Sequence, residues 1–222
     1  MTSREFAEQL SRRAHRAGAS VTESEQHQFE EYIRLLARWN SRINLTSLPV
    51  DPPTDEAVDR LLIEPLVAAR HLPDAGGLWL DLGSGGGSPA IPLKILGPLK
   101  RLTMVEANAR KSAFLREAVR TLALADVLVE NTRFEELSGR PEFRRQASLV
   151  TVRAVRADDR LLEAAGALLG DGGRLALFRS GQLGNEGWKG FNLVESVRLL
   201  QDSPTYLASL QLAFHVEQTQ TD

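Results

Sequence analysis

The sequence predicts an α/β protein: a Rossmann-like, mostly parallel sheet of seven strands, the last of them antiparallel, preceded by a helical extension. Three observations carry this prediction. Residues 1–72 show apolar side chains at helical spacing. Strand-like and helix-like segments alternate from about residue 76 onward, as they do where parallel strands are joined by right-handed crossovers. A strand, a glycine-rich loop and a helix follow one another in residues 78–93.

The N-terminal extension, residues 1–75, is predicted to hold three helices. The first has apolar residues at four-residue steps: Phe6, Leu10 and Ala14. Thr22 and Glu25 have the spacing of a capping box and begin the second helix. The apolar stripe of that helix consists of Phe29, Ile33, Leu36 and Trp39. A third helix is predicted over residues 54–72, and we expect the extension and residues 76–222 to form one compact unit.

The strand–loop–helix unit at residues 78–93 is the centre of the sheet domain. Its apolar strand Leu78–Leu82 runs into Gly83, Ser84 and three further glycines. Glycine takes positive φ and lets the backbone pass close to a ligand. Ser88 and Pro89 match the N-cap and the first-turn proline of a helix. A helix N-terminus offers free N–H groups and a positive partial charge, so this unit predicts a ligand site.

The spacing in this loop indicates which ligand it takes. A dinucleotide fingerprint has the form G-x-G-x-x-G, but counting from Gly83 the sixth position is Ser88. Asp81 stands two residues before the first glycine, where it would repel a pyrophosphate and could accept a hydrogen bond from an ammonium group. The pattern Asp81, Gly83, Gly85, Gly87 therefore favours a ligand with a cationic amino-acid end. It resembles motif I of the S-adenosylmethionine-dependent methyltransferases, and a tight turn without a ligand is the alternative.

The remaining elements alternate along the chain. Strands are predicted at residues 102–105, 127–129, 149–152 and 174–178, and helices at residues 108–122 and 157–169. Residues 191–200 and 206–216 have no clear helix between them, so we expect an antiparallel hairpin that closes one edge of the sheet.

Candidate ligand-binding residues follow the second and third strands. In doubly wound sheets the ligand lies beyond the carboxyl ends of the strands. Glu106 ends the second strand, where a carboxylate suits the two hydroxyls of a ribose; a solvated acid is the alternative. Phe134 and Glu135 follow the third strand, where an aromatic ring and a backbone N–H could hold an adenine. A plain helix start explains the same two residues equally well.

Arginines follow the fourth and fifth strands. Arg153 and Arg156 come after the fourth strand, and Arg179 comes after the fifth. Several arginines at the sheet edge that holds a nucleotide-like pocket suggest a polyanionic substrate. Solvated strand-end charges are the other interpretation.

Composition excludes several classes of protein. The chain has no cysteine, so it has neither disulfides nor thiolate metal sites, and its four scattered histidines give no metal-ligand spacing. The N-terminus lacks the apolar core of a secretory signal, and no apolar run reaches the roughly 18 residues of a membrane span. We therefore expect a cytoplasmic protein. A net charge of −2 counts mildly against a nucleic-acid partner.

Five segments together resemble the bacterial small-subunit ribosomal RNA guanine-N7 methyltransferases, also called the glucose-inhibited division protein B family. In chain order they are WNSRINLT, DLGSGGGSPAIPL, MVEANARKSAFL, TRFEEL and VRAVR. They are similar to that family's WN-x-x-x-NLT segment, its glycine loop, its second-strand acid with a basic helix, its R-x-E-E segment and its R-A-x-A segment. The similarity covers about residues 29–181. The proline pattern P-x-I-P after the glycine loop is far more specific than the general methyltransferase motif.

This resemblance implies a class I S-adenosylmethionine-dependent enzyme that methylates N7 of a guanine in 16S rRNA. It implies contacts to S-adenosylmethionine at Gly83, Ser88, Phe134, Glu135 and Arg153, with Glu106 on the ribose. Arg153 and Arg179 are expected to carry catalysis, by binding cofactor or phosphate and by positioning the RNA backbone. The expected partner is 16S rRNA or the small ribosomal subunit, bound by a monomer with no metal and no membrane.

The chain departs from the family pattern mainly in its substrate half. The departures are Leu61 in place of a histidine, Ala90 in place of a glycine, Arg179-Ser180 in place of Lys-Gly, and Thr205 in place of a basic residue. Three alternatives therefore stay open. They are a methyltransferase with another substrate, a cofactor-binding protein that has lost catalysis, and a dinucleotide oxidoreductase.

Overall fold

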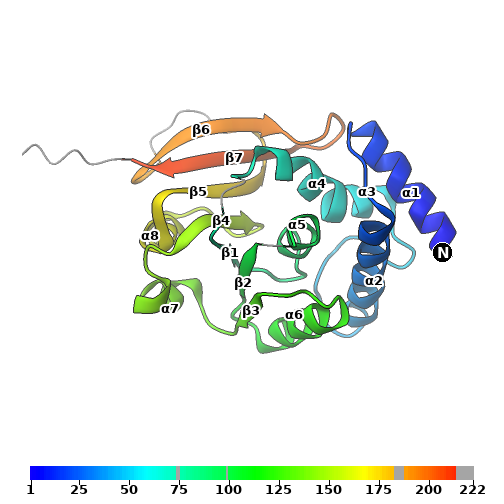
Figure 1. Ribbon diagram of the computed structural model, residues 1–222, viewed down its shortest axis with the longest axis horizontal. Helices are drawn as coiled ribbons and strands as arrows, with labels where there is room; N and C mark the ends of the chain where they lie inside the picture. The colour runs from blue at the N-terminus through cyan, green and yellow to red at the C-terminus, as the bar shows by residue number, and fades with distance from the viewer. Residues whose placement is uncertain (74–75, 99, 183–187, 214–222) are drawn as a thin grey trace, which may run out of the picture.

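A seven-stranded sheet forms the middle of the protein (Figure 1). The computed structural model describes residues 1–73, 76–98, 100–182 and 188–213. Its strands are β1 Leu78–Leu82, β2 Arg101–Val105, β3 Val127–Glu130, β4 Ala147–Arg153, β5 Leu169–Ser180, β6 Phe191–Arg198 and β7 Thr205–Leu212. They lie in the order β3-β2-β1-β4-β5-β7-β6.

The pairing of these strands confirms the predicted fold class. Strands β1 to β5 are parallel to one another, and β7 is antiparallel to both β5 and β6. The strand order reverses at β1, which pairs with β2 on one side and with β4 on the other. Because ligands bind where the order of a doubly wound sheet reverses, the crevice above β1 and β4 is the expected site. Residues 214–216 of the predicted last strand lie outside the described residues.

Helices cover both faces of the sheet (Figure 1). One face carries α1 Ser3–Arg16, α2 Glu23–Asn40, α3 Asp55–Val58, α4 Glu64–Ala68, α5 Ala90–Leu96 and α6 Ala109–Thr121. The other carries α7 Phe134–Ser138 and α8 Asp159–Leu168. The predicted capping box is present in α2, where the Thr22 hydroxyl accepts from the Glu25 N–H and the Glu25 carboxylate accepts from the Thr22 N–H. In the part of the chain that the structure describes, no helix combines the length and the apolar character needed to span a bilayer.

Two apolar clusters hold these layers together. The first joins the extension to one face of the sheet, with Phe29, Leu36 and Phe114 packed towards Trp79 and Met104. The second packs the other face of the sheet against α8. Because the stripe of α2 and the residues Phe6, Leu10 and Ala14 of α1 are part of the first cluster, the extension shares its core with the sheet.

The helix predicted over residues 54–72 is present as a helical stretch from Asp55 to His71, but it is not one regular α-helix. Thr54 caps α3, and a π-helical segment, Asp59–Ile63, separates α3 from α4. The Glu64 N–H donates to the carbonyl of Asp59, five residues earlier, so the carbonyl of Arg60 loses its helical partner. Pro65 lacks an N–H, so the carbonyl of Leu61 has none either. Both carbonyls are used by residues of the site.

The predicted N-cap role of Ser88 is wrong. Helix α5 begins at Ala90, and its N-cap position is Pro89 without a side-chain cap. The Ser88 hydroxyl instead donates to the Leu61 carbonyl at 2.9 Å. The Leu61 carbonyl is free because Pro65, four residues later, has no N–H. Its hydrogen bond to Ser88 joins residues far apart in the sequence, which a local sequence rule does not predict.

Candidate functional site

The glycine loop between β1 and α5 has the backbone that its sequence predicts. Gly83, Gly85 and Gly87 take φ values of +77°, +50° and +89°. A Cβ atom at Gly83 would lie 2.5 Å from Cγ2 of Val155, and one at Gly87 would lie 2.4 Å from Cδ1 of Ile91. Only glycine meets both the conformation and the space at these two positions.

Glu106 lies against this loop, as predicted. Its Oε2 accepts from the Gly85 N–H at 2.9 Å, and its Oε1 accepts from the Asn108 N–H at 2.8 Å. The Asn131 side chain donates to the Glu106 carbonyl at 2.9 Å, which brings the end of β3 beside the end of β2. A carboxylate in this place repels phosphate and attracts hydroxyl and ammonium donors.

Asp81 lies beneath the loop. Its side chain is 1% exposed, and its Oδ1 accepts from the Thr151 hydroxyl of β4 at 2.5 Å. Burial raises the pKa of Asp81 to about 6, although the hydrogen bonds from Thr151 and Ser84 oppose that rise. One carboxylate oxygen of Asp81 is thus hydrogen-bonded within the protein. A contact between Asp81 and a cationic ligand stays a prediction.

Arg153 and Ser88 lie side by side just before α5. The resemblance implies that both contact S-adenosylmethionine, and that role stays a prediction. The Arg153 guanidinium donates to the Ser88 hydroxyl at 3.2 Å and to the freed Arg60 carbonyl at 2.6 Å. It also lies 5.2 Å from the centre of the Phe178 ring. Burial and the nearby Arg60 lower the pKa of Arg153 to about 9, so the group is still charged at neutral pH.

Glu64 is a residue of this region that sequence reasoning missed. Its side chain is fully buried, forms an ion pair with Arg153 and accepts from the Ser203 hydroxyl at 2.6 Å. Three elements therefore meet at this carboxylate: α4, the end of β4 and the turn between β6 and β7. The one signal in the sequence was an acid next to proline inside an apolar run, which does not by itself distinguish a buried ion pair from an exposed acid.

Phe134 and Glu135 lie at the start of α7. Phe134 is half-buried and packs on the second apolar cluster, whereas Glu135 is exposed. Both the helix start and the position after β3 are as predicted. Asn131, three residues before Phe134, ties the end of β3 to Glu106, and a contact of Phe134 and Glu135 with a ligand stays a prediction.

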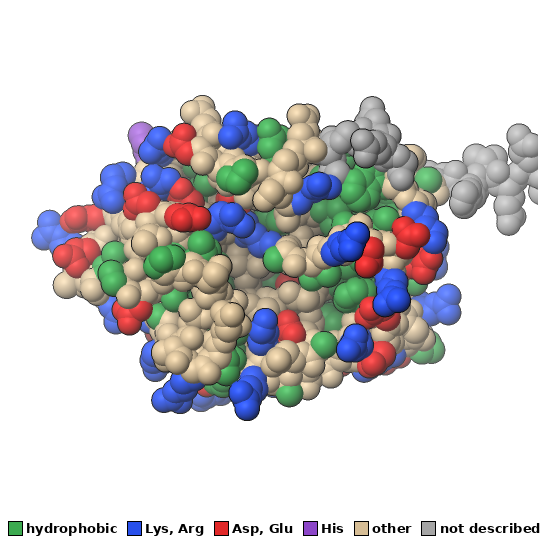
Figure 2. Space-filling view, turned by 180° about the vertical axis from the view of Figure 1, so that it is seen from behind, with side chains coloured by type: hydrophobic (Ala, Val, Ile, Leu, Met, Phe, Trp, Pro, Cys, Tyr) green, Lys and Arg blue, Asp and Glu red, His purple; other side chains and the backbone are tan. Residues whose placement is uncertain are grey.

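Two adjoining cavities, of about 310 and 370 Å³, lie beyond the ends of β4 and β5. They share Val155, Phe178, Arg179 and Ser180. Arg60 and Arg153 line the first, and Arg156 lines the second. Figure 2 shows a face that is hollowed near its centre, with Lys and Arg side chains gathered around the hollow. The predicted arginines Arg153, Arg156 and Arg179 are therefore brought together.

Thr205 borders the same hollow but differs from the basic residue that it replaces. It is buried, and its hydroxyl lies 3.1 Å from the Ser203 hydroxyl, within the network of Glu64. The position thus serves the fold in this chain.

The helical extension supports the glycine loop from below. The Tyr32 hydroxyl of α2 donates to the Gly86 carbonyl at 2.7 Å, and burial raises the pKa of that hydroxyl. The Asn40 side chain accepts from the N–H groups of Leu45 and Thr46 at 2.8 and 2.9 Å. A Cβ atom at Gly86 would lie 3.2 Å from the Leu45 carbonyl. The WNSRINLT segment is therefore a turn, closed by Asn40, that abuts the loop.

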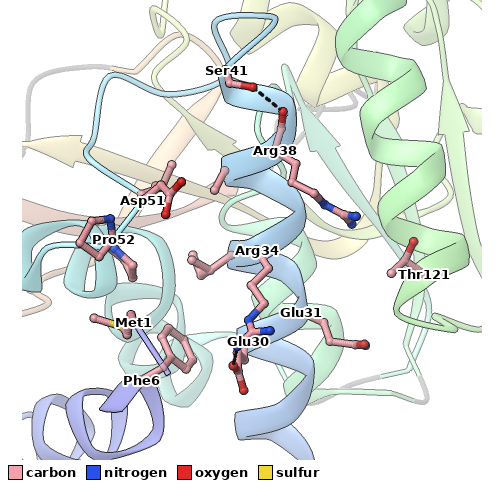
Figure 3. A pocket seen from close by; sticks show the side chains of 14 residues that line it. Met1, Phe6, Glu30, Glu31, Arg34, Arg38, Ser41, Asp51, Pro52 and Thr121 are labelled. Carbon is pink, nitrogen blue, oxygen red and sulfur yellow. Dashed lines mark hydrogen bonds and ion pairs between the residues drawn. The ribbon is translucent and has the colours of Figure 1, made fainter. Parts of the chain in front are cut away.

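A larger cleft of about 640 Å³ lies away from these residues, among α1, α2 and the turn at residues 50–53 (Figure 3). Arg34 and Glu30 form an ion pair of 2.5 Å on its wall. It contains none of the predicted site residues.

The crevice fits S-adenosylmethionine better than a dinucleotide. Glu106 lies beside the glycine loop, and Arg153 is the basic residue that hydrogen-bonds this part of the described chain, at Ser88. Two carboxylates, Asp81 and Glu106, are unsuited to a pyrophosphate and suited to a cation.

Comparison with known proteins agrees with this geometry. The family model GidB, described as rRNA small subunit methyltransferase G, matches residues 25–199. Ribosomal RNA small subunit methyltransferase G of Pseudomonas paraeruginosa is 41% identical over 139 residues, which are 63% of this chain and 62% of that protein. The protein of the same name from Chloroflexus aggregans is 39% identical over 158 residues, 71% of this chain and 65% of that protein. The chain thus spans somewhat less than two thirds of the length of these relatives.

Solved structures show the same fold at low identity. A SAM dependent methyltransferase from Aquifex aeolicus has a TM-score of 0.54 and 14% identity, over 70% of this chain and 93% of that one. The mitomycin 7-O-methyltransferase MmcR has a TM-score of 0.55 and 15% identity, over 86% of this chain and 69% of that one. The sheet with its N-terminal helices is therefore that of the class I S-adenosylmethionine-dependent methyltransferases.

Proposed function

Because the chain belongs to the GidB family of rRNA small subunit methyltransferases G, we propose that it methylates N7 of a guanine in 16S rRNA, with S-adenosylmethionine as methyl donor. One observation supports the use of S-adenosylmethionine. The Glu106 carboxylate accepts a hydrogen bond from the Gly85 N–H in the crevice where the strand order reverses. The arginines around the neighbouring hollow support a polyanionic substrate.

The reaction requires little acid–base chemistry from the protein. S-Adenosylmethionine supplies a methyl group on a cationic sulfur, and guanine N7 has a lone pair and no proton to lose. No side chain has to act as a general base, which agrees with two cavities whose lining holds no carboxylate and no histidine among the described residues. Catalysis then rests on proximity and on orientation.

Each site residue has a role in that orientation. Gly83, Gly85 and Gly87 let the backbone approach the cofactor, and Glu106 binds the ribose hydroxyls. Phe134 and Glu135 flank the adenine, and Asp81 balances the positive charge of the amino-acid end. Arg153, held by Ser88 and Glu64, shapes the side of the crevice that faces the RNA, and Arg179 contacts the RNA.

The proposed substrate also indicates the compartment in which the enzyme acts, and the site indicates its oligomeric state. The enzyme acts in the cytoplasm, where small subunits are assembled, and as a monomer, because one chain supplies the glycine loop, Glu106 and the arginine-lined hollow.

The test is methyl transfer to small ribosomal subunits from a strain that lacks this protein. With methyl-labelled S-adenosylmethionine, nucleoside analysis should find the label in 7-methylguanosine. Glu106→Ala should weaken cofactor binding in a calorimeter by about tenfold or more, because it removes charged hydrogen-bond acceptors. Glu142→Ala, which removes an exposed acid, is the matched control. Label in another nucleoside, or unchanged binding by Glu106→Ala, would contradict the proposal.

A second candidate is a methyltransferase with another acceptor. The burial of Thr205 favours it, because a basic residue of the family is here replaced by a structural one. Intact cofactor binding without transfer to small subunits, together with transfer to other cellular RNA or to a small molecule, would support this alternative.

A further inference from the structure

Two buried hydrogen-bond donors in the hollow have no partner. Nε of Arg179 and Nε1 of Trp188 are buried and make no hydrogen bond within the described residues. Both side chains line the same cavity of about 370 Å³. Buried donors are almost always satisfied in folded proteins, so an open arginine donor on the wall of a cavity points to a missing acceptor.

The two side chains also lie close together. The Arg179 guanidinium lies 6.0 Å from the centre of the Trp188 ring. Guanidinium planes and aromatic rings are the groups on which proteins stack unpaired bases. The rest of the wall is apolar, with Val152, Leu177 and Phe178.

This cavity adjoins the proposed cofactor site. Val155 lines it and also packs on Gly83, the first glycine of the loop. The neighbouring cavity of about 310 Å³ shares Arg179 and reaches Arg153, which bonds Ser88. A base in this cavity would thus be separated from the glycine loop by one side chain.

Trp188 is held in place by the backbone and by its neighbour. The Phe191 N–H donates to the Trp188 carbonyl at 2.7 Å. Lys189 turns away from the cavity and pairs with Glu163 of α8 at 2.6 Å. The backbone of Trp188 is therefore anchored at the entry to β6.

We propose that Trp188 and Arg179 form the pocket for the target base and select guanine; this inference rests on the proposed function. The base stacks on the face of the indole, and the open Arg179 donor meets an acceptor on the edge of the base. Guanine presents O6 as an acceptor at the position where adenine presents an N6 amino donor. An arginine donor therefore favours guanine and leaves adenine with two donors facing each other.

The experiment combines single-turnover methylation of small subunits with binding of GMP and AMP, followed by tryptophan fluorescence. Trp188→Ala should slow methyl transfer by roughly tenfold or more, since a base–aromatic stack is lost. Trp188→Phe keeps the ring and should slow transfer less than Trp188→Ala does. Arg179→Ala should reduce the preference for GMP over AMP. Lys189→Ala, next in the chain but directed at α8, is the matched control. Cofactor affinity should stay constant throughout.

Two outcomes separate this inference from the proposed function. If the wild type methylates guanine and Trp188→Ala does so at the same rate, the pocket assignment is wrong and the proposed function stands. If the wild type transfers no methyl group, the proposed function fails, and GMP binding decides about the pocket. In that case, saturable quenching by GMP that Trp188→Phe abolishes would support the pocket, and no preference for GMP over AMP would overturn it.

Discussion

At the scale of one residue, Asp81 shows how burial beneath the glycine loop disfavours the charged form of a carboxyl group. Its carboxyl group is buried, which raises its pKa from 3.8 to about 6, and the hydrogen bonds from Thr151 and Ser84 offset only part of the desolvation. The folded state therefore holds this proton more tightly than the unfolded chain does. The stability that follows is fully present below about pH 4 and is lost as the pH rises through 6.

Asp81→Asn should remove this pH dependence. The amide keeps an oxygen for the Thr151 hydroxyl and has no charge to desolvate. We expect the free energy of unfolding of the variant, relative to the wild type, to rise by about 2 to 3 kcal/mol between pH 4 and pH 7. Urea denaturation at several pH values measures this difference. Asp171→Asn, at an exposed aspartate, controls for the loss of one charge, and a flat difference for Asp81→Asn would contradict the prediction.

At the scale of elements, the carboxylate of Glu64 joins three segments that are far apart in the sequence. It pairs with Arg153 at the end of β4, and it accepts from Ser203 in the turn before β7. The π-helical turn before α4 frees the Arg60 carbonyl, which holds the same guanidinium. The irregular helix is thus what places Arg153 beside Ser88.

Glu64→Ala should destabilise the protein by about 3 to 5 kcal/mol, because it leaves the Arg153 charge buried and unpaired. Chemical denaturation measures the loss. Glu130→Ala, which breaks the more exposed pair with Arg140, should cost under about 1 kcal/mol and is the control. Equal losses in the two variants would show that the buried pair has no special role.

Local sequence patterns predicted some features of the structure and missed others. The capping box at Thr22, the strand Leu78–Leu82 and the acid after β2 follow from short-range rules, and the structure has them. Pro65 is a local signal for an irregular helix at residues 54–72, but the use of the freed carbonyls by Ser88 and Arg153 depends on residues distant in the sequence. Trp188 was missed because its neighbours in space, not in sequence, make it part of the hollow.

At the scale of the whole molecule, the sheet and the helical extension share one apolar core. Phe29 and Leu36 of α2 are fully buried in the cluster that also holds Trp79 of β1 and Phe114 of α6. Trp39 meets Phe114 edge to face, with ring centres 6.0 Å apart. The alternation of strands and helices predicted the sheet domain, but the spacing of apolar residues in the extension gave only the stripe and not the surface that it covers.

A shared core predicts a single unfolding transition. Separating residues 1–75 from the sheet would expose the stripe of α2 and would leave the glycine loop without its contacts to Tyr32 and Leu45. Domains that bury each other's apolar surface unfold together, so signals from each part should change at the same denaturant concentration. We expect far-ultraviolet circular dichroism and the fluorescence of Trp39 and Trp79 to give coincident midpoints. Excess S-adenosylmethionine should raise all of them equally, because a ligand of the folded state stabilises the whole cooperative unit. A separate early transition in the Trp39 signal would show that the extension is an independent domain.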